Sequence, residues 1–228
     1  MEVKIIKNSI DSLDLVYVAA KTCYGKKTPK QLASEVGTKT TRDKLAFIKS
    51  IVKAGHYSVL EHYNITVMIE GVSRSLLAQL SRHRHISMSV QQQRTNADLS
   101  NFEYIMPSSI KNGSHRYVTD YVIAMDKIKV AYNSLIAVGI PQEDARMLLP
   151  NACTTNIVMT VNLRTLIEIC HKRLCFKAQW EIRELFSNIK YFLLEQWFYP
   201  YLQPKCFLTH ECNEIKPCGN NPWRMDDE

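Results

Sequence analysis

The sequence predicts an α+β fold: a single domain, residues 1–228, in which long helices pack on a mixed or antiparallel sheet. Three observations lead to this prediction. Segments with helical and strand periodicity interleave without strict βαβ repetition. No internal repeat and no linker rich in glycine, proline and serine divides the 228 residues. Hydrophobic residues make up 46% and charged residues 22%, a balance typical of globular proteins.

The N-terminal quarter of the chain predicts one strand and two helices. Residues 2–7 form a short strand, and Asp11 or Ser12 caps a helix that stops near Gly25. Residues 26–42 are polar and predict a loop with at most a helical turn. A stripe of apolar residues over 42–54 then predicts a helix, which Gly55 ends.

The middle of the chain continues the alternation of element types. Residues 64–70 alternate as in a strand until Gly71 breaks the pattern, and residues 72–83 repeat apolar side chains with helical spacing. A further strand is expected at 102–106, before Pro107. The longest periodic segment, 115–137, predicts a long helix.

Four features describe the C-terminal third. Pro141 suits the first turn of a helix that reaches about Leu149. Residues 153–161 alternate loosely and predict a strand. Asn162 is a plausible N-cap for a helix that runs past Arg173, and a last helix is expected over about 177–198. Residues 205–228 are a candidate peripheral tail.

Charge and cysteine content limit the class of protein. The net charge is +7 and the isoelectric point is about 9.0, which favours anionic partners such as nucleotides, phosphorylated cofactors, nucleic acid or anionic lipid. No apolar run approaches the roughly 20 residues that cross a bilayer, and no signal peptide is recognisable. Seven scattered cysteines without a C-x-x-C pair indicate a reduced, cytoplasmic protein.

The most informative segment runs from Arg82 to Arg94 and reads RHRHISMSVQQQR. Arginine forks match the paired oxygens of phosphate and carboxylate, and glutamine and serine add neutral donors. We interpret the segment as a binding loop for an anionic, ring-bearing small molecule. A solvated basic turn is the alternative. No P-loop and no G-x-G-x-x-G motif is present, so arginines would have to hold any nucleotide.

The helix expected after Asn162 places Arg164 and Arg173 on nearly opposite faces. One helix can therefore present arginines to two ligands. The alternative for Arg164 is a surface ion pair with Glu168, four residues further on.

No metal site is expected. Cys206, His210, Cys212 and Cys218 do not have the spacing of a tight zinc knuckle, although one equivalent of tightly bound zinc would overturn this expectation. His83 and His85 stand among arginines that would repel a cation.

Several ordered blocks resemble the flavin-dependent thymidylate synthases. Arg82-His83-Arg84, seven further residues and then Gln92-Gln93-Arg94 match the family signature R-H-R-x7-(S/Q)-x-R. Residues 56–62 resemble the family's H-x-(S/T)-x-x-E-H segment, and Gln79 precedes the signature as in the family. Residues 144–150, 162–164, 173 and 178–182 are similar to the remaining blocks. The resemblance covers roughly residues 50–195.

The resemblance implies an enzyme, an FAD-dependent methyltransferase that makes dTMP from dUMP. Its one-carbon donor would be 5,10-methylenetetrahydrofolate, and FAD reduced by NADPH would carry the hydride. The family is homotetrameric with sites shared between subunits, and neither nucleic acid nor membrane is an expected partner. Because the signature position is Gln92 here, and an amide is no nucleophile at carbon, we expect no covalent catalysis from it.

The resemblance also assigns residues. Arg173 is the expected catalytic residue, beside the uracil, and His56 lies on the folate side. The expected dUMP-binding residues are Gln79, Leu80, Ser81, Arg82, Val90, Gln91, Gln92, Gln93, Arg94, Arg146 and Arg173. The expected FAD-binding residues are Ser58, Glu61, Arg82, His83, Arg84, Val90, Asn162, Leu163, Arg164 and Glu168. Two other readings stay open: a basic nucleic-acid-binding protein, and a non-catalytic relative that only binds ligand.

Overall fold

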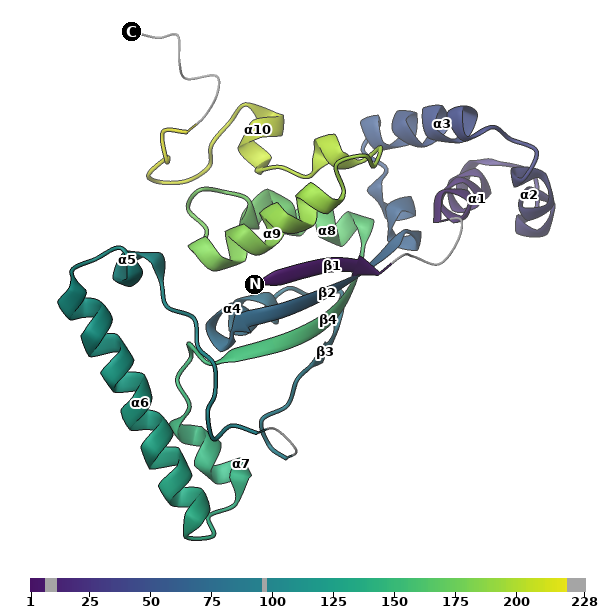
Figure 1. The fold of residues 1–228 in the computed structure, drawn as a ribbon. Coiled ribbons are helices and arrows are strands. Elements are labelled where there is room, and N and C mark those ends of the chain that lie inside the picture. The colour runs from purple at the N-terminus through teal and green to yellow at the C-terminus, as the bar shows by residue number, and fades with distance from the viewer. Residues whose placement is uncertain (7–11, 96–97, 221–228) are drawn as a thin grey trace, which may run out of the picture. The chain divides into compact units, whose positions relative to one another are not determined.

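The computed structural model describes residues 1–6, 12–95 and 98–220, and it has the expected α+β architecture (Figure 1). Its antiparallel sheet contains β1 (Glu2–Ile6), β2 (Asn64–Ser73), β3 (Ile86–Val90) and β4 (Thr154–Asn162), in the order β1-β2-β4-β3. Thr66 lies opposite Thr160, with their hydroxyl oxygens 3.0 Å apart, which fixes the register of β2 on β4.

By their internal contacts the residues form two compact units. Unit 1 comprises Met1–Glu2, Ile69–Arg82 and Ser89–Val158. Unit 2 comprises Val3–Met68, His83–Met88 and Met159–Glu228. The expected FAD-binding residues fall mainly in unit 2, whereas most of the expected dUMP-binding residues fall in unit 1.

The strand predictions were right for β1, within the described residues, and for β4, but β2 is longer than expected. Gly71 does not end this strand, which continues to Ser73. Gly71 has a φ of +64°, and its N–H donates to the Asn156 side-chain oxygen at 3.0 Å. Glycine adopts this left-handed backbone without a Cβ penalty, so the strand can bend at Gly71 and remain paired.

Two other strand expectations need correction. The signature segment is not simply a loop, because it contains β3, in which half-buried Ile86, Met88 and Val90 alternate with exposed Ser87 and Ser89. Its polar flanks conceal this two-residue period. The strand expected at 102–106 is reduced to an isolated antiparallel bridge between Tyr104 and Cys153.

The helices agree with the sequence where the apolar period is long. The four matching helices are α1 (Ser12–Tyr24), α3 (Thr41–Lys53), α6 (His115–Ala137) and α8 (Leu163–Arg173). The helix expected at 72–83 is the shorter α4 (Arg74–Leu80), because Ser73 caps it. The helix expected from Pro141 is divided into α7 (Gln142–Ala145) and a 3-10 turn, η2 (Arg146–Leu148).

The last expected helix is interrupted in the structure. Gln179 caps α9 (Trp180–Phe192), and the chain after it forms η3 (Tyr199–Tyr201) and α10 (Lys205–Thr209). Two further short elements are η1 (Tyr57–His62) and α5 (Ser108–Lys111).

The polar segment 26–42 contains a full helix that the sequence analysis missed. It is α2 (Pro29–Val36), which begins with a capping box. The Thr28 hydroxyl oxygen accepts from the Gln31 N–H, and the Gln31 side-chain oxygen accepts from the Thr28 N–H. The T-x-x-Q pattern that signals such a cap was present in the sequence.

Each unit has its own core. In unit 2, fully buried side chains include Leu60, Ile65, Leu166 and Phe186. Unit 1 has two smaller clusters, one around Phe102, Met125 and Cys153 and one around Leu99, Tyr132 and Ala145. Among the described residues, no helix has the length and apolar character needed to cross a bilayer.

Candidate functional site

The start of helix α8 is fixed by its cap. The Asn162 side-chain oxygen accepts a hydrogen bond from the Thr165 N–H at 2.8 Å, as the sequence predicted. Leu163 is fully buried, and its N–H donates to the Tyr63 carbonyl at 2.7 Å. Both residues therefore hold the helix in place, and a ligand could meet Leu163 only through its backbone.

Arg164, in the first turn of α8, is held by two carboxylates. Its guanidinium donates to Glu61 at 2.7 Å and to Glu168 at 3.2 Å. The hydrogen bond to Glu61, then the one to Glu168, raises the pKa of Arg164. The ion pair with Glu168 was anticipated from the spacing, whereas Glu61 comes from η1, which packs against α8. Three of the expected flavin residues thus lie together.

His56 caps the same 3-10 turn and belongs to an aromatic pair. The Tyr24 hydroxyl lies 3.3 Å from the His56 ring nitrogens, and the two rings pack edge to face with centroids 5.6 Å apart. Tyr24 is 67% exposed and Ser58 is exposed close to His56 in the chain. This pair offers exposed aromatic surface close to Ser58, and no pattern in the sequence pointed to Tyr24.

Arg173, the last residue of α8, is bound to a histidine of the signature. Its Nε–H donates to His83 Nε2 at 2.7 Å. Burial, then the charges of Arg173 and Lys172, lowers the pKa of His83 to about 4. His83 is therefore neutral at pH 7 and acts as an acceptor, so it orients the Arg173 guanidinium without neutralising its charge.

The first two arginines of the signature, Arg82 and Arg84, precede and follow His83 in the sequence, and both are exposed. His85 follows with a φ of +61°, a left-handed conformation that is unusual for a residue with a side chain. The chain therefore turns sharply between the exposed arginines and strand β3.

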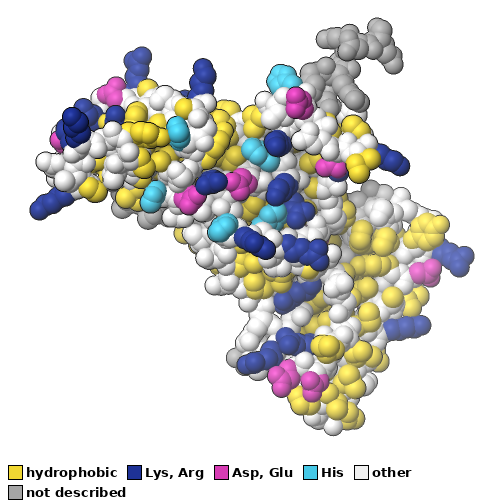
Figure 2. All heavy atoms as spheres, turned by 180° about the vertical axis from the view of Figure 1, so that it is seen from behind, with side chains coloured by type: hydrophobic (Ala, Val, Ile, Leu, Met, Phe, Trp, Pro, Cys, Tyr) yellow, Lys and Arg dark blue, Asp and Glu magenta, His cyan; other side chains and the backbone are white. Residues whose placement is uncertain are grey.

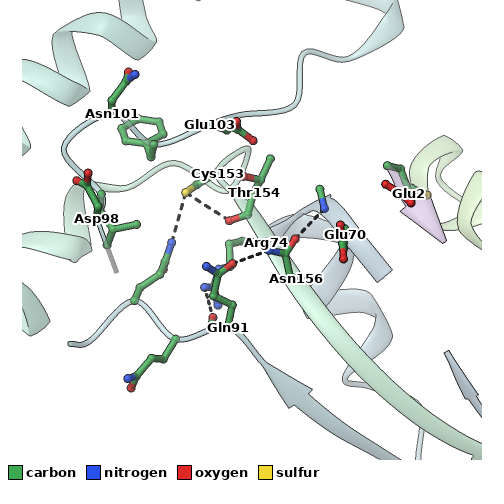
Figure 3. A pocket seen from close by; sticks show the side chains of 16 residues that line it. Glu2, Glu70, Arg74, Gln91, Asp98, Asn101, Glu103, Cys153, Thr154 and Asn156 are labelled. Carbon is green, nitrogen blue, oxygen red and sulfur yellow. Dashed lines mark hydrogen bonds between the residues drawn. The ribbon is translucent and has the colours of Figure 1, made fainter. Parts of the chain in front are cut away.

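In unit 1, three glutamines follow β3 and each makes a hydrogen bond within the protein; Figure 3 labels the first of them, Gln91. Gln91 is engaged most fully: its N–H, its carbonyl and its side-chain oxygen all have protein partners, two of them on Asn156. Gln93 donates to the Cys153 sulfur at 3.4 Å, and Gln92 donates to the Thr95 hydroxyl at 2.8 Å. Gln91 and Gln92 are both exposed, but Gln91 is held by three groups of the protein, so the side chain of Gln92 is the freer of the two to meet a ligand.

Arg74, at the start of α4, is a residue that the sequence analysis did not assign. Its Nη2 donates to the Gln91 carbonyl at 2.7 Å, while its buried Nε has no partner among the described residues. Burial lowers the pKa of Arg74, the Cys153 thiolate would raise it, and the Arg146 guanidinium lowers it. Arg74 thus sets the position of the chain just before Gln92 and lies within electrostatic reach of Arg146.

The pocket drawn in Figure 3 has a volume of about 650 Å³ and includes Arg74 and the three glutamines in its lining. Glu2, Glu70, Asp98 and Glu103 also line it. Such a concentration of carboxylates disfavours a phosphate. We therefore do not place an anionic ligand deep in this pocket.

The remaining expected dUMP residues of unit 1 differ in accessibility. Leu80 is fully buried, so only its backbone could contact a ligand. Gln79 and Val90 are half-buried, and Ser81 and Arg94 are exposed. Arg146 is half-buried, and its Nε–H donates to the Glu143 carbonyl at 3.0 Å.

Comparisons with known proteins agree on one family. A family model described as thymidylate synthase complementing protein matches residues 4–198. The flavin-dependent thymidylate synthase of Geobacter sulfurreducens is 38% identical over 186 residues, which cover 81% of this chain and 78% of that protein. The protein of the same name from Nitratidesulfovibrio vulgaris is 38% identical over 241 residues, which cover 98% of this chain and 96% of that protein. The protein of the same name from Sulfolobus acidocaldarius is 34% identical over 237 residues, which cover 100% of this chain and 84% of that protein.

Proposed function

We propose that this chain, which belongs to the thymidylate synthase complementing protein family, is a flavin-dependent thymidylate synthase that converts dUMP to dTMP. The observation that carries the proposal is the bond between Arg173 and His83. It joins the signature to the end of α8 and presents a positive charge oriented by a neutral group.

The donor set of unit 2 fits FAD. Exposed Arg84 is suited to a diphosphate, whereas the hydroxyl of Ser58 and the fixed guanidinium of Arg164 are suited to ring carbonyls. We assign FAD to these residues together with Glu61, His83 and Glu168, with Asn162 and Leu163 positioning the helix. Arg82 and Val90 stay predicted FAD contacts. When bound, the flavin supplies the hydride transfer, and the protein supplies placement and charge.

We assign dUMP binding to the arginines and polar groups around the signature. Arg82, Arg94 and Arg146 would bind the phosphate, while Gln79, Gln92 and the backbone of residues 80, 81, 90, 91 and 93 would contact the nucleoside. Arg173 would lie beside the uracil and stabilise the negative charge that develops as N3 loses its proton, which makes C5 more nucleophilic. No protein nucleophile is required, because Gln92 cannot supply one.

The co-substrates complete the reaction. NADPH would reduce the flavin, and 5,10-methylenetetrahydrofolate would donate the methylene carbon. The Tyr24–His56 pair supports a folate contact, because two aromatic rings can pack against a pterin ring. All these ligands are anionic, so the net charge of +7 favours their encounter with the protein, which we place in the cytoplasm.

We also propose that the chain forms a homotetramer, and helix α6 supports this. Its buried residues Met125 and Tyr132 lie on one side, whereas Ile123 and Val130, 47% and 66% exposed, lie on the opposite side. Figure 2 shows hydrophobic side chains over much of the surface of the part that carries α6. Exposed apolar surface of this extent typically marks an interface.

The assembly proposal is tested with the double variant Ile123→Glu, Val130→Glu. We expect it to elute as a smaller species in size-exclusion chromatography with light scattering, while wild type elutes as a tetramer. Ala124→Glu changes an exposed residue on another side of the same helix and should leave the mass unchanged. A monomeric wild-type protein would refute the proposal.

The function is tested by dTMP formation from dUMP, methylenetetrahydrofolate and NADPH, with and without added FAD. We expect flavin-dependent product and a yellow purified protein. Colourless protein that binds DNA in a salt-sensitive way would instead favour the nucleic-acid-binding alternative. Bound flavin without dTMP formation would favour the non-catalytic relative.

A further inference from the structure

A cluster of thiols lies in unit 2, outside the residues assigned to the reaction. Cys175 follows the end of α8, Cys206 lies in α10, and Cys212 comes shortly after it. These three cysteines line one pocket of about 460 Å³, and His171 of α8 lines it too. Since α10 packs against α8, the fold brings together cysteines from two distant parts of the sequence.

Cys218 belongs to the same cluster. Cys218 lies within electrostatic range of Cys206, as Cys175 and Cys212 do. It does not line the pocket itself but follows Cys212 by six residues. All four are partly buried free thiols.

His171 has the arrangement of a histidine ready to bind a metal. Its Nε2 is buried and has no partner among the described residues, and the backbone of Tyr201 lies close to its ring. A buried ring nitrogen without a partner is free to bind a metal, provided that the second nitrogen is held by a neighbouring group.

The charges around the cluster do not exclude a cation. Glu168, Glu211 and Glu214 line the pocket together with Lys172 and Lys205. Because Glu168 is paired with Arg164, the other two carboxylates balance the two amines and the rim is close to neutral. Thiolates add further negative charge once a metal has displaced their protons.

We propose that Cys175, Cys206 and Cys212 bind a zinc ion, with Cys218 or His171 as the fourth ligand. Four protein ligands without an open position make such a site structural rather than catalytic. The ion would fasten the chain beyond α10 onto the C-terminal half of α8, the helix that carries Arg164 and Arg173. The proposal replaces the expectation from sequence spacing, which could not bring Cys175 into the set.

Zinc binding requires the ligands to converge. Within residues 1–6, 12–95 and 98–220, no three histidine, cysteine or acidic side chains already stand in a metal-binding arrangement. The segment around Cys212 and Cys218 has no helix or strand, so it can move the sulfurs toward a common centre without breaking regular structure.

The first test is the metal content of the full-length protein, purified without chelators and analysed by inductively coupled plasma mass spectrometry. We expect about one zinc per chain, as structural sites bind tightly at neutral pH. Cys206→Ser and Cys212→Ser should lose it. Cys23→Ser, which changes an exposed cysteine of α1, should retain it. Of Cys218→Ser and His171→Phe, the variant that loses zinc identifies the fourth ligand.

A second measurement does not depend on variants that fold. Removing metal from wild-type protein with a strong chelator should expose Glu211 and Glu214 to a glutamate-specific protease, and added zinc should restore protection. Replacing zinc with cobalt should give the visible spectrum of a tetrahedral thiolate site. Protein that has no metal, gives no cobalt spectrum and reacts freely with a thiol reagent at Cys175, Cys206, Cys212 and Cys218 would overturn the proposal. A disulfide among these cysteines in the purified protein would overturn it as well.

Discussion

The two arginines at the ends of α8 have opposite surroundings. Arg164 is clamped between Glu61 and Glu168, both of which carry negative charge. Arg173 donates to a neutral imidazole. The two lie about 14 Å apart along the helix axis and half a turn around it.

The difference indicates that the two arginines have different roles. A guanidinium paired with two carboxylates belongs to a group with a net charge of −1, so it provides geometry rather than positive charge, which suits hydrogen bonds to the ring of a large cofactor. A guanidinium oriented by a neutral acceptor keeps its positive charge, which suits stabilising an anion that forms during a reaction. The predictions below test this division.

The largest effect is expected for Arg173→Ala. Turnover should fall by about 100- to 1,000-fold, the usual cost of losing one group that stabilises developing charge. Flavin content should not change. The measurements are the rate of dTMP formation and the flavin absorbance of the purified variant.

Lys172→Ala is the matched control, since Lys172 is the neighbouring positive charge that also affects His83. It should retain most of the activity. Equal loss of flavin and turnover in Arg173→Ala would reassign Arg173 to the cofactor and remove the contrast between the two ends of α8.

Arg164→Ala should reduce flavin affinity by about 10- to 100-fold, because a charge-assisted hydrogen bond contributes roughly 1.5–3 kcal/mol. The variant also leaves Glu61 and Glu168 without their cation, close to an anionic cofactor. Titration of the apoprotein with FAD measures the effect. Arg164→Lys keeps the charge but loses the forked geometry, so an intermediate affinity is expected.

A moderate effect is expected from pH. Burial and nearby positive charges lower the pKa of His83 from its ordinary value of 6.5 to about 4, so the unfolded chain binds this proton more readily than the folded one. The stability that neutral His83 contributes is complete above pH 6.5 and is lost as pH falls toward 4. Urea unfolding at pH 7 and pH 5 should show a drop in the free energy of unfolding.

His83→Gln isolates this contribution. Glutamine offers an oxygen that can still accept a hydrogen bond from Arg173 Nε, but it does not titrate. The free energy of unfolding of the variant should therefore fall less between pH 7 and pH 5 than that of wild type. His171, whose pKa is also lowered by burial, is common to both proteins and cancels in the difference. Identical pH dependence in the two proteins would show that His83 is not the responsible group.

The smallest effect is expected for Gln92→Ser. Gln92 is exposed and makes a neutral hydrogen bond to Thr95, so turnover should change by less than about tenfold. Complete loss of activity would show that the amide has a role beyond binding.

Local signals predicted much of this molecule. Asn162 as the cap of α8 and the pair of Arg164 with Glu168 follow from neighbouring positions along the sequence, and the structure has both. The helical spacing of apolar residues over 115–137 predicted both ends of α6 correctly. Such features depend on contacts within one helix, which sequence spacing encodes directly.

The rest depended on contacts between distant segments. Glu61 is far from Arg164 in sequence, and Arg74 meets Gln91 only because a helix start and a strand end lie side by side. β3 was missed because its three half-buried residues are enclosed by arginines and glutamines. Whether such a short polar segment forms a strand depends on its pairing with distant strands, which the local sequence pattern does not reveal.

The uncovered side of α6 has a consequence for measuring this protein at low concentration. If other copies cover Ile123 and Val130, dilution toward the dissociation constant would separate the subunits and lower the activity of each chain. Specific activity would then rise with enzyme concentration before reaching a plateau. An assay at a single low enzyme concentration would underestimate the specific activity. A compound that binds this helix would inhibit the enzyme without resembling any substrate.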